Sequence, residues 1–119
     1  MTQPPFRTSD AATDAAALLR LHPTHVIYKH SPTCGLSAMA AVAVSAYEET
    51  PGALPVTMVD VLGARPLSNA LEAVTGVRHE SPQVLIVRDG EVRWSASHRR
   101  VTAEALAVAA RAVRGASRD

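Results

Sequence analysis

The chain contains one cysteine, Cys34, and its position in the sequence suits thiol chemistry. It follows the turn-forming segment 30–33 and stands at the start of a helical pattern. At a helix N-terminus, unpaired backbone N–H groups and the positive end of the helix dipole stabilise an anion, which here is the thiolate. This placement lowers the pKa of a thiol and makes it reactive. A small buried side chain without reactivity also suits the position, and position alone does not decide between the two.

Ser37 follows Cys34 in the segment Cys34-Gly-Leu-Ser37, about one helical turn further on. Its hydroxyl group and its backbone N–H can therefore donate hydrogen bonds to a thiolate. In the redox motif Cys-x-x-Cys the second thiol occupies this position, so a serine here leaves the chain without an internal resolving thiol. Because serine is also common in the first turn of a helix, the motif alone is a weak signal.

Two further pairs of residues precede a predicted strand, His79-Glu80 and Ser81-Pro82. A histidine beside a glutamate orients or charges a site in some proteins, although a solvated loop pair is the more frequent arrangement. About one X–Pro bond in twenty is cis in folded proteins, so the sequence alone favours a trans bond before Pro82.

The composition excludes several classes of protein. Lys and Arg number 12 against 11 Asp and Glu, and the net charge of +1 excludes a strongly basic nucleic-acid binder. A single cysteine excludes an intrachain disulfide framework and a multi-cysteine zinc site. His30, His79 and His98 are residue types that could join Cys34 at zinc, but no two of the four have the spacing of paired ligands, so we expect no metal.

The sequence has no segment typical of membrane insertion or secretion. No apolar run approaches the roughly 20 residues that a membrane-spanning helix needs. Residues 1–7 lack the apolar region of a secretory signal. We therefore expect a cytoplasmic protein without a membrane partner, in a compartment where a lone thiol stays reduced.

Hydrophobic periodicity predicts alternating helices and strands. The helix between the first two strands makes them parallel, and the Asp89-Gly90 turn makes the last two strands an antiparallel hairpin. The sequence therefore predicts one α/β domain over residues 1–119, with a four-stranded mixed sheet, helices on both faces and a loose lead-in at 1–8. The strands are expected at 25–29, 55–61, 83–88 and 91–96, and the main helices at about 34–49, 65–75 and 102–114.

Particular residues mark the ends and inner faces of these helices. Pro66 suits the first position of its helix and Gly76 suits the C-terminal cap, while Thr102 suits the N-cap of the last helix. The helix after Cys34 has one apolar face at helical spacing, formed by Leu36, Ala40, Ala43, Val44 and Tyr47.

The segment Lys29-His-Ser-Pro-Thr-Cys-Gly-Leu-Ser37 resembles the active-site stretch of the monothiol bacilliredoxins (YtxJ-like), which are linked to the thiol bacillithiol. The matches run from about residue 25 to 106, and Gly76-Val-Arg-His-Glu-Ser-Pro-Gln83 is long and specific. The main departure is Gly35, where relatives commonly carry proline. The other similar segments are Arg65–Asn69, Asp89-Gly90 and Ala96–His98.

The resemblance implies a thioredoxin-like fold in which Cys34 is the nucleophile. It implies a cis bond at Ser81–Pro82 that faces the sulfur, with the Ser81 backbone pairing with a bound thiol or peptide. It also places cationic residues near Cys34, where they would bind the malate carboxylates of bacillithiol, although Arg78 equally suits a solvated loop. The supporting residues that it implies are Lys29, His30, Thr33, Gly35, Ser37, Arg78, His79, Ser81 and Pro82.

We therefore expect a monothiol thiol–disulfide oxidoreductase that removes bacillithiol from bacillithiolated proteins. Its co-substrate would be bacillithiol, with no tightly bound cofactor, and a low-molecular-weight thiol from solution would complete the cycle. A non-enzymatic interaction module with the same fold is one alternative, in which Cys34 would be buried with an ordinary pKa near ~8.5. The other is a glutaredoxin-like carrier that holds an iron–sulfur cluster between two chains through Cys34 and an external thiol.

Overall fold

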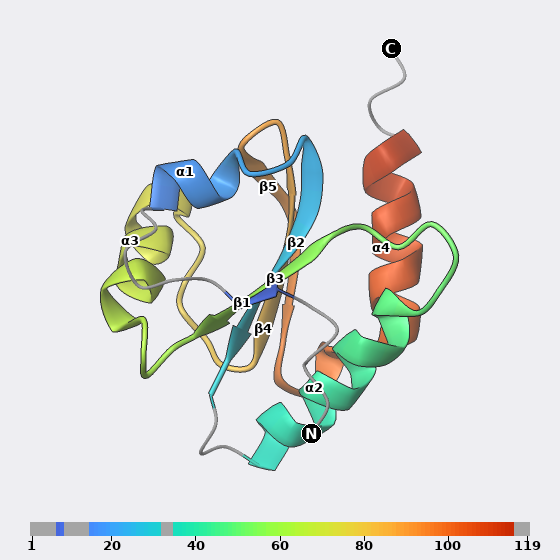
Figure 1. Cartoon of the computed structure of the whole chain (residues 1–119), viewed down its shortest axis with the longest axis horizontal. Helices are drawn as coiled ribbons and strands as arrows, with labels where there is room; N and C mark the ends of the chain where they lie inside the picture. The colour runs from blue at the N-terminus through green and yellow to red at the C-terminus, as the bar shows by residue number, and fades with distance from the viewer. Residues whose placement is uncertain (1–6, 9–14, 32–34, 116–119) are drawn as a thin grey trace.

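A mixed five-stranded sheet forms the centre of the protein, as the computed structural model shows (Figure 1). The structure describes residues 7–8, 15–31 and 35–115. The order of the strands across the sheet is β1-β3-β2-β4-β5. The strands are β1 (Arg7–Thr8), β2 (Thr24–His30), β3 (Val56–Asp60), β4 (Gln83–Arg88) and β5 (Glu91–Ser97).

The four predicted strands and their directions are confirmed. β2 and β3 are parallel, β4 runs antiparallel to β2, and β4 and β5 form the hairpin around Asp89 and Gly90. The difference is at the edge, where Arg7 pairs with Thr57 and Thr8 with Met58 in a parallel strand of two residues. These two residues were predicted to lie in a loose lead-in. A two-residue strand is too short to show an alternating pattern, so its pairing depends on β3 rather than on its own sequence.

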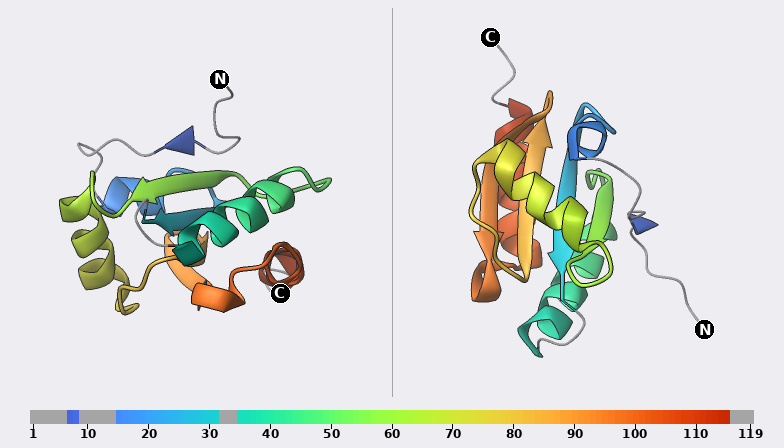
Figure 2. Two further views of the ribbon diagram at one scale, coloured as in Figure 1. Left: turned by 90° about the horizontal axis from the view of Figure 1, so that it is seen from below. Right: turned by 90° about the vertical axis from the view of Figure 1, so that its left-hand side faces the viewer.

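Helices cover both faces of the sheet (Figures 1 and 2). One face carries α1 and α3, which pack against each other, and the opposite face carries α2 and α4. Among the residues that the structure describes, no helix has the length and apolar character needed to span a bilayer. The helices are α1 (Ala15–Leu19), α2 (Gly35–Glu48), α3 (Arg65–Thr75) and α4 (Ala103–Gly115), with a short 3₁₀ turn η1 (His98–Arg100) before α4.

The side chains of β2 alternate between the two faces, as the pleat of a strand requires. Val26 and Tyr28 lie in the core under α2 and α4, whereas Ile27 lies in the core under α1 and α3. By the same alternation, the Lys29 side chain points toward α3 and the His30 side chain points toward α2. The two residues that end β2 therefore belong to different sides of the sheet.

The predicted helix ends are confirmed by the backbone. Pro66 stands in the first turn of α3, and Gly76 ends that helix with a left-handed φ of 74° while its N–H donates to the Glu72 carbonyl at 3.0 Å. Thr102 accepts a hydrogen bond from the Ala105 N–H at its Oγ1, at 3.0 Å. These ends depend on local chemistry, which is why the sequence predicts them.

The inner face of α2 differs from the predicted one by a small rotation. Leu36 and Ala43 are partly exposed, and the buried face includes Ser37 instead. The spacing of the buried residues still follows one side of a helix. They are Ser37, Ala40, Val44 and Tyr47.

Candidate active site

Thr33 and Cys34 lie outside the described residues, and the structure describes the chain on both sides of them. β2 ends at His30, Ser31 is buried, and α2 begins at Gly35. The cysteine therefore belongs to a short connection between the carboxyl end of a central strand and the first turn of a helix, as predicted. Gly35 is exposed, and a Cβ added there would meet nothing within 4 Å.

Ser37 is buried beneath this connection and forms a hydrogen bond that joins its two ends. Its side chain has 0% exposure, and its Oγ accepts a hydrogen bond from the Ser31 N–H at 3.3 Å. The bond joins the residue that follows β2 to the first turn of α2, so it spans the segment that carries Cys34. The predicted donation from the Ser37 hydroxyl to a thiolate concerns an atom outside the described residues and stays a prediction.

A second polar group lies beside this bond on the α2 side of the sheet. The Tyr28 hydroxyl donates to the Ser37 carbonyl at 3.2 Å and lies 2.8 Å from Nδ1 of His30. Burial lowers the pKa of His30, and the charge of Asp60 opposes that shift. His30 is thus held against Tyr28, half-buried, at the end of β2.

Lys29 and His79 meet on the other side, under α3. The Lys29 side chain is 1% exposed, and its Nζ donates to Nδ1 of His79 at 3.3 Å. Ser68 Oγ lies at the same distance from that nitrogen, and the His79 N–H donates to Glu72 Oε2 at 2.9 Å. Burial is the main cause of a lowered pKa at both Lys29 and His79, and the Lys29 charge lowers the pKa of His79 further. A neutral imidazole with Nδ1 as acceptor fits this environment.

The predicted cationic residues therefore do not form one surface cluster. The structure brings Lys29 and His79 together in the interior, leaves His30 against Tyr28 and exposes Arg78. Lys29 was expected to face a substrate carboxylate, but near the end of the central strand β2 its side chain is buried under α3. No group of three or more His, Cys, Asp or Glu side chains in the described part of the chain is arranged to hold a metal ion.

The Ser81–Pro82 peptide bond is cis, which the resemblance implied and the sequence alone did not favour. Pro82 is buried, and its carbonyl accepts a hydrogen bond from the His98 N–H at 2.9 Å. Two buried polar atoms of this segment, Ser81 Oγ and Gln83 Oε1, have no hydrogen-bond partner among the described residues. Gln83 Nε2 donates to the Arg78 carbonyl at 3.0 Å, which ties the loop before the proline to the start of β4.

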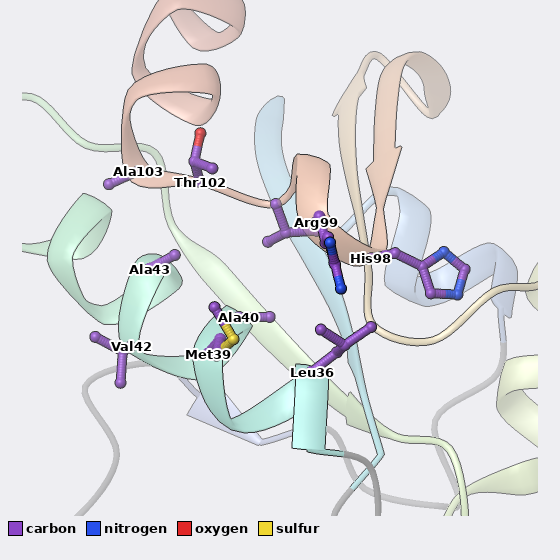
Figure 3. Close-up of a pocket in the computed structure, with 10 residues that line it drawn as sticks. Leu36, Met39, Ala40, Val42, Ala43, His98, Arg99, Thr102 and Ala103 are labelled. Atoms are coloured by element: carbon purple, nitrogen blue, oxygen red, sulfur yellow. The ribbon is translucent and has the colours of Figure 1, made fainter.

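A groove that the sequence did not predict lies beside the start of α2. One part has a volume of about 570 Å³ and an apolar floor that includes Leu36, Met39 and Val42 (Figure 3). In the sequence, the basic end of the groove corresponds to three consecutive basic residues after a predicted strand, His98, Arg99 and Arg100. Of these, only His98 was a predicted candidate. That basic part has a volume of about 520 Å³ and is lined by Leu36, Glu80, Ser97, His98, Arg99 and Arg100.

Comparison with known proteins agrees with this architecture. A candidate oxidoreductase with a thioredoxin fold superposes with a TM-score of 0.70 and 29% sequence identity, over 77% of this chain and 81% of that protein. Mitochondrial thioredoxin 3 from Saccharomyces cerevisiae superposes with a TM-score of 0.70 and 14% identity, over 90% of this chain and 94% of that protein. Thioredoxin from Plasmodium falciparum superposes with a TM-score of 0.69 and 10% identity, over 91% of this chain and 97% of that protein.

The last two likenesses establish the fold alone, which is thioredoxin-like, as predicted. The family is established by sequence, since the family model for monothiol bacilliredoxin BrxC matches residues 8–106. That match includes Cys34, the cis Ser81–Pro82 bond and η1. The chain therefore belongs to the monothiol bacilliredoxins, a family of thiol oxidoreductases with a thioredoxin fold.

Proposed function

We propose that this protein removes bacillithiol from mixed disulfides with other proteins, with Cys34 as the nucleophile. The Cys34 thiolate attacks the bacillithiol sulfur, a new disulfide forms between them, and the original disulfide breaks. The target protein leaves as a thiolate and takes a proton from water. A second low-molecular-weight thiol then attacks the disulfide on Cys34, releases the enzyme thiolate and is oxidised to a disulfide with bacillithiol.

One observation carries the proposal. The family match covers most of the chain, and the whole chain contains a single cysteine. A thiol oxidoreductase needs a thiol, so the nucleophile of this chain is Cys34. Because no second cysteine exists to resolve the mixed disulfide, the resolving thiol has to come from solution.

The surrounding residues support this chemistry in different ways. The hydrogen bond from the Ser31 N–H to Ser37 Oγ fixes the two ends of the segment that carries Cys34. The start of α2 supplies free N–H groups that stabilise a thiolate. In our proposal the Ser81 backbone, next to the cis-proline, pairs with the extended backbone of the bound target.

The test is the mass of the intact protein after incubation with bacillithiol disulfide. We expect one bacillithiol adduct on the wild type and none on Cys34→Ser. A bacillithiolated model protein should then lose its adduct when the wild type and free bacillithiol are added together. Failure of the wild type to take up bacillithiol would overturn the proposal.

A further inference from the structure

We propose that the basic end of the groove binds the carboxylates of an anionic low-molecular-weight thiol, with Arg99 and Arg100 as the residues that determine this specificity. The inference rests on the proposed function and deepens it. It assigns charge recognition to the 3₁₀ turn η1, whereas the resemblance implied a different set of residues, Lys29, His30, Arg78 and His79.

The groove lies where three segments of the site meet. Its wall on α2 is Leu36, which follows Cys34 by two residues in the sequence. On the opposite side, the His98 N–H donates to the Pro82 carbonyl at 2.9 Å, so η1 is fastened directly to the cis-proline. The Val101 N–H closes the 3₁₀ turn on the His98 carbonyl at 3.2 Å. The backbone of η1, which carries the two arginines, is therefore held in place beside the start of α2.

The arginines keep their charge available. Both are exposed, and neither forms an ion pair with any residue that the structure describes. Glu80 is the carboxylate among the described residues that line the groove, and it lies 3.7 Å from Nδ1 of His98. A hydrogen bond from the Ser97 side chain lowers the pKa of Glu80, and the nearby charge of Arg100 lowers it further. Two guanidinium groups against one carboxylate leave the groove positive.

The basic end of the groove is concave and large enough to hold a small anion. Figure 3 shows the Arg99 side chain pointing across the groove toward Leu36, while the His98 ring turns away from it. A volume of about 520 Å³ lies within the range of roughly 300–1,000 Å³ typical of small-molecule sites. Guanidinium groups bind carboxylates through paired hydrogen bonds, and Leu36 offers an apolar contact for the uncharged part of the thiol.

The experiment measures the rate of adduct formation on Cys34 with two small disulfides that differ in charge, dithiodipropionate and hydroxyethyl disulfide. In Arg99→Gln/Arg100→Gln we expect the rate with dithiodipropionate to fall about fivefold at low salt, in keeping with the modest strength of partly exposed ion pairs. The rate with the uncharged disulfide should stay at the wild-type value. Added salt should slow the wild type with the anionic disulfide and leave the variant almost unaffected.

Two further variants separate charge recognition from structure. Arg99→Lys/Arg100→Lys keeps the charge and should retain most of the wild-type rate. Arg93→Gln/Arg111→Gln removes the same charge from exposed positions outside the groove and should react like the wild type. Equal losses with both disulfides, or an unchanged rate with dithiodipropionate, would overturn the inference.

Bacillithiol disulfide and glutathione disulfide form the second arm of the experiment. Both carry carboxylates, and we expect both to depend on the two arginines. If the wild type reacts with dithiodipropionate through the arginines but takes up no bacillithiol, the proposed function is wrong and the anion site stands. If the wild type forms no adduct with any disulfide, both proposals are wrong.

Discussion

The Lys29 ammonium group lies inside the protein, although its residue type is usually found at the surface. His79 accepts from it, and the Glu72 carboxylate opposes the effect of burial on its pKa. A buried charge persists only where partners of this kind compensate its desolvation. Lys29 therefore holds the loop before the cis-proline to β2.

At the same scale, Ser37→Ala tests the bond that spans the cysteine segment. The variant removes the hydrogen bond between the Ser31 N–H and Ser37 Oγ, and the loss of one such bond costs about 0.5–1.5 kcal/mol of unfolding free energy. It also removes the predicted donor to the thiolate, so the pKa of Cys34 should rise. Urea denaturation measures the first effect, and the pH dependence of iodoacetamide alkylation measures the second.

Ser45→Ala is the matched control, because Ser45 lies on the same helix and is only half-buried. We expect it to change neither the stability by more than ~0.5 kcal/mol nor the alkylation profile. An alkylation profile of Ser37→Ala identical to that of the wild type would contradict a role of this serine in thiol activation.

At the scale of the element, the first residue of α2 is Gly35. Gly35→Pro should raise the unfolding free energy by about 0.4–1 kcal/mol, because proline suits the first turn of a helix and restricts the unfolded chain. The space for a side chain is open, since an added Cβ meets no atom within 4 Å. The midpoint of urea unfolding measures the gain.

Gly35→Ala is the comparison for this prediction. It fills the same space but restricts the unfolded chain less, so its gain should be smaller than that of proline. A loss of stability in the proline variant would show that the Gly35 backbone has a conformation, or makes a hydrogen bond, that proline cannot reproduce.

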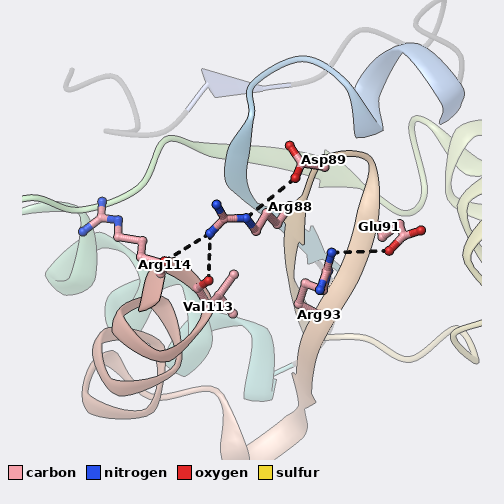
Figure 4. A network of polar contacts seen from close by, with 6 residues as sticks. All are labelled: Arg88, Asp89, Glu91, Arg93, Val113 and Arg114. Atoms are coloured by element: carbon pink, nitrogen blue, oxygen red, sulfur yellow. Dashed lines mark hydrogen bonds and ion pairs between the residues drawn. The ribbon is translucent and has the colours of Figure 1, made fainter. Parts of the chain in front are cut away.

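At the scale of the whole molecule, one arginine joins the end of the sheet to the end of the chain's last helix. Arg88 Nη1 donates to the carbonyls of Val113 at 2.9 Å and Arg114 at 3.2 Å, which closes the C-terminus of α4 (Figure 4). The same side chain lies 3.7 Å from the carboxylate of Asp89.

Three histidines with lowered pKa values make the stability of the whole molecule sensitive to acid. Burial is the main cause at His25, His30 and His79. A lowered pKa means that the unfolded chain binds protons more readily than the folded one, so stability is complete above the ordinary value of 6.5 and is lost as the pH falls below it. Each such group contributes a slope of up to about 1.4 kcal/mol per pH unit.

Urea denaturation at a series of pH values from neutral to acidic measures this loss. His25 should contribute clearly, because its Nε2 donates to the Leu19 carbonyl at 3.1 Å and its buried Nδ1 has no partner among the described residues. His25→Gln should therefore flatten the dependence on pH, whatever its effect on absolute stability. His98→Gln, at an exposed position on η1, serves as the control, since His22 contacts the His25 ring and its charge lowers the pKa of His25. A variant of His25 with the wild-type slope would contradict this assignment.

Much of the fold follows from features that are local in the sequence. Apolar β-rich runs predict the strands β2 to β5, and the Asp89-Gly90 turn predicts the hairpin of β4 and β5. Pro66 and Gly76 predict the two ends of α3. Each of these features acts over a few residues, so no distant contact is needed to interpret it. The sequence alone also identifies the proposed nucleophile, because the chain has one cysteine.

Only the tertiary structure decides which of the predicted site residues lie together. Lys29 and His79 meet because α3 packs over β2, and Ser37 turns inward because α2 rotates to bury it. A cis or trans bond before a proline differs by roughly 1 kcal/mol in free energy, so its surroundings decide it. The basic groove needs η1 and the start of α2, which are far apart in the sequence, to lie side by side. Contacts of this kind depend on long-range packing, which a single sequence does not display.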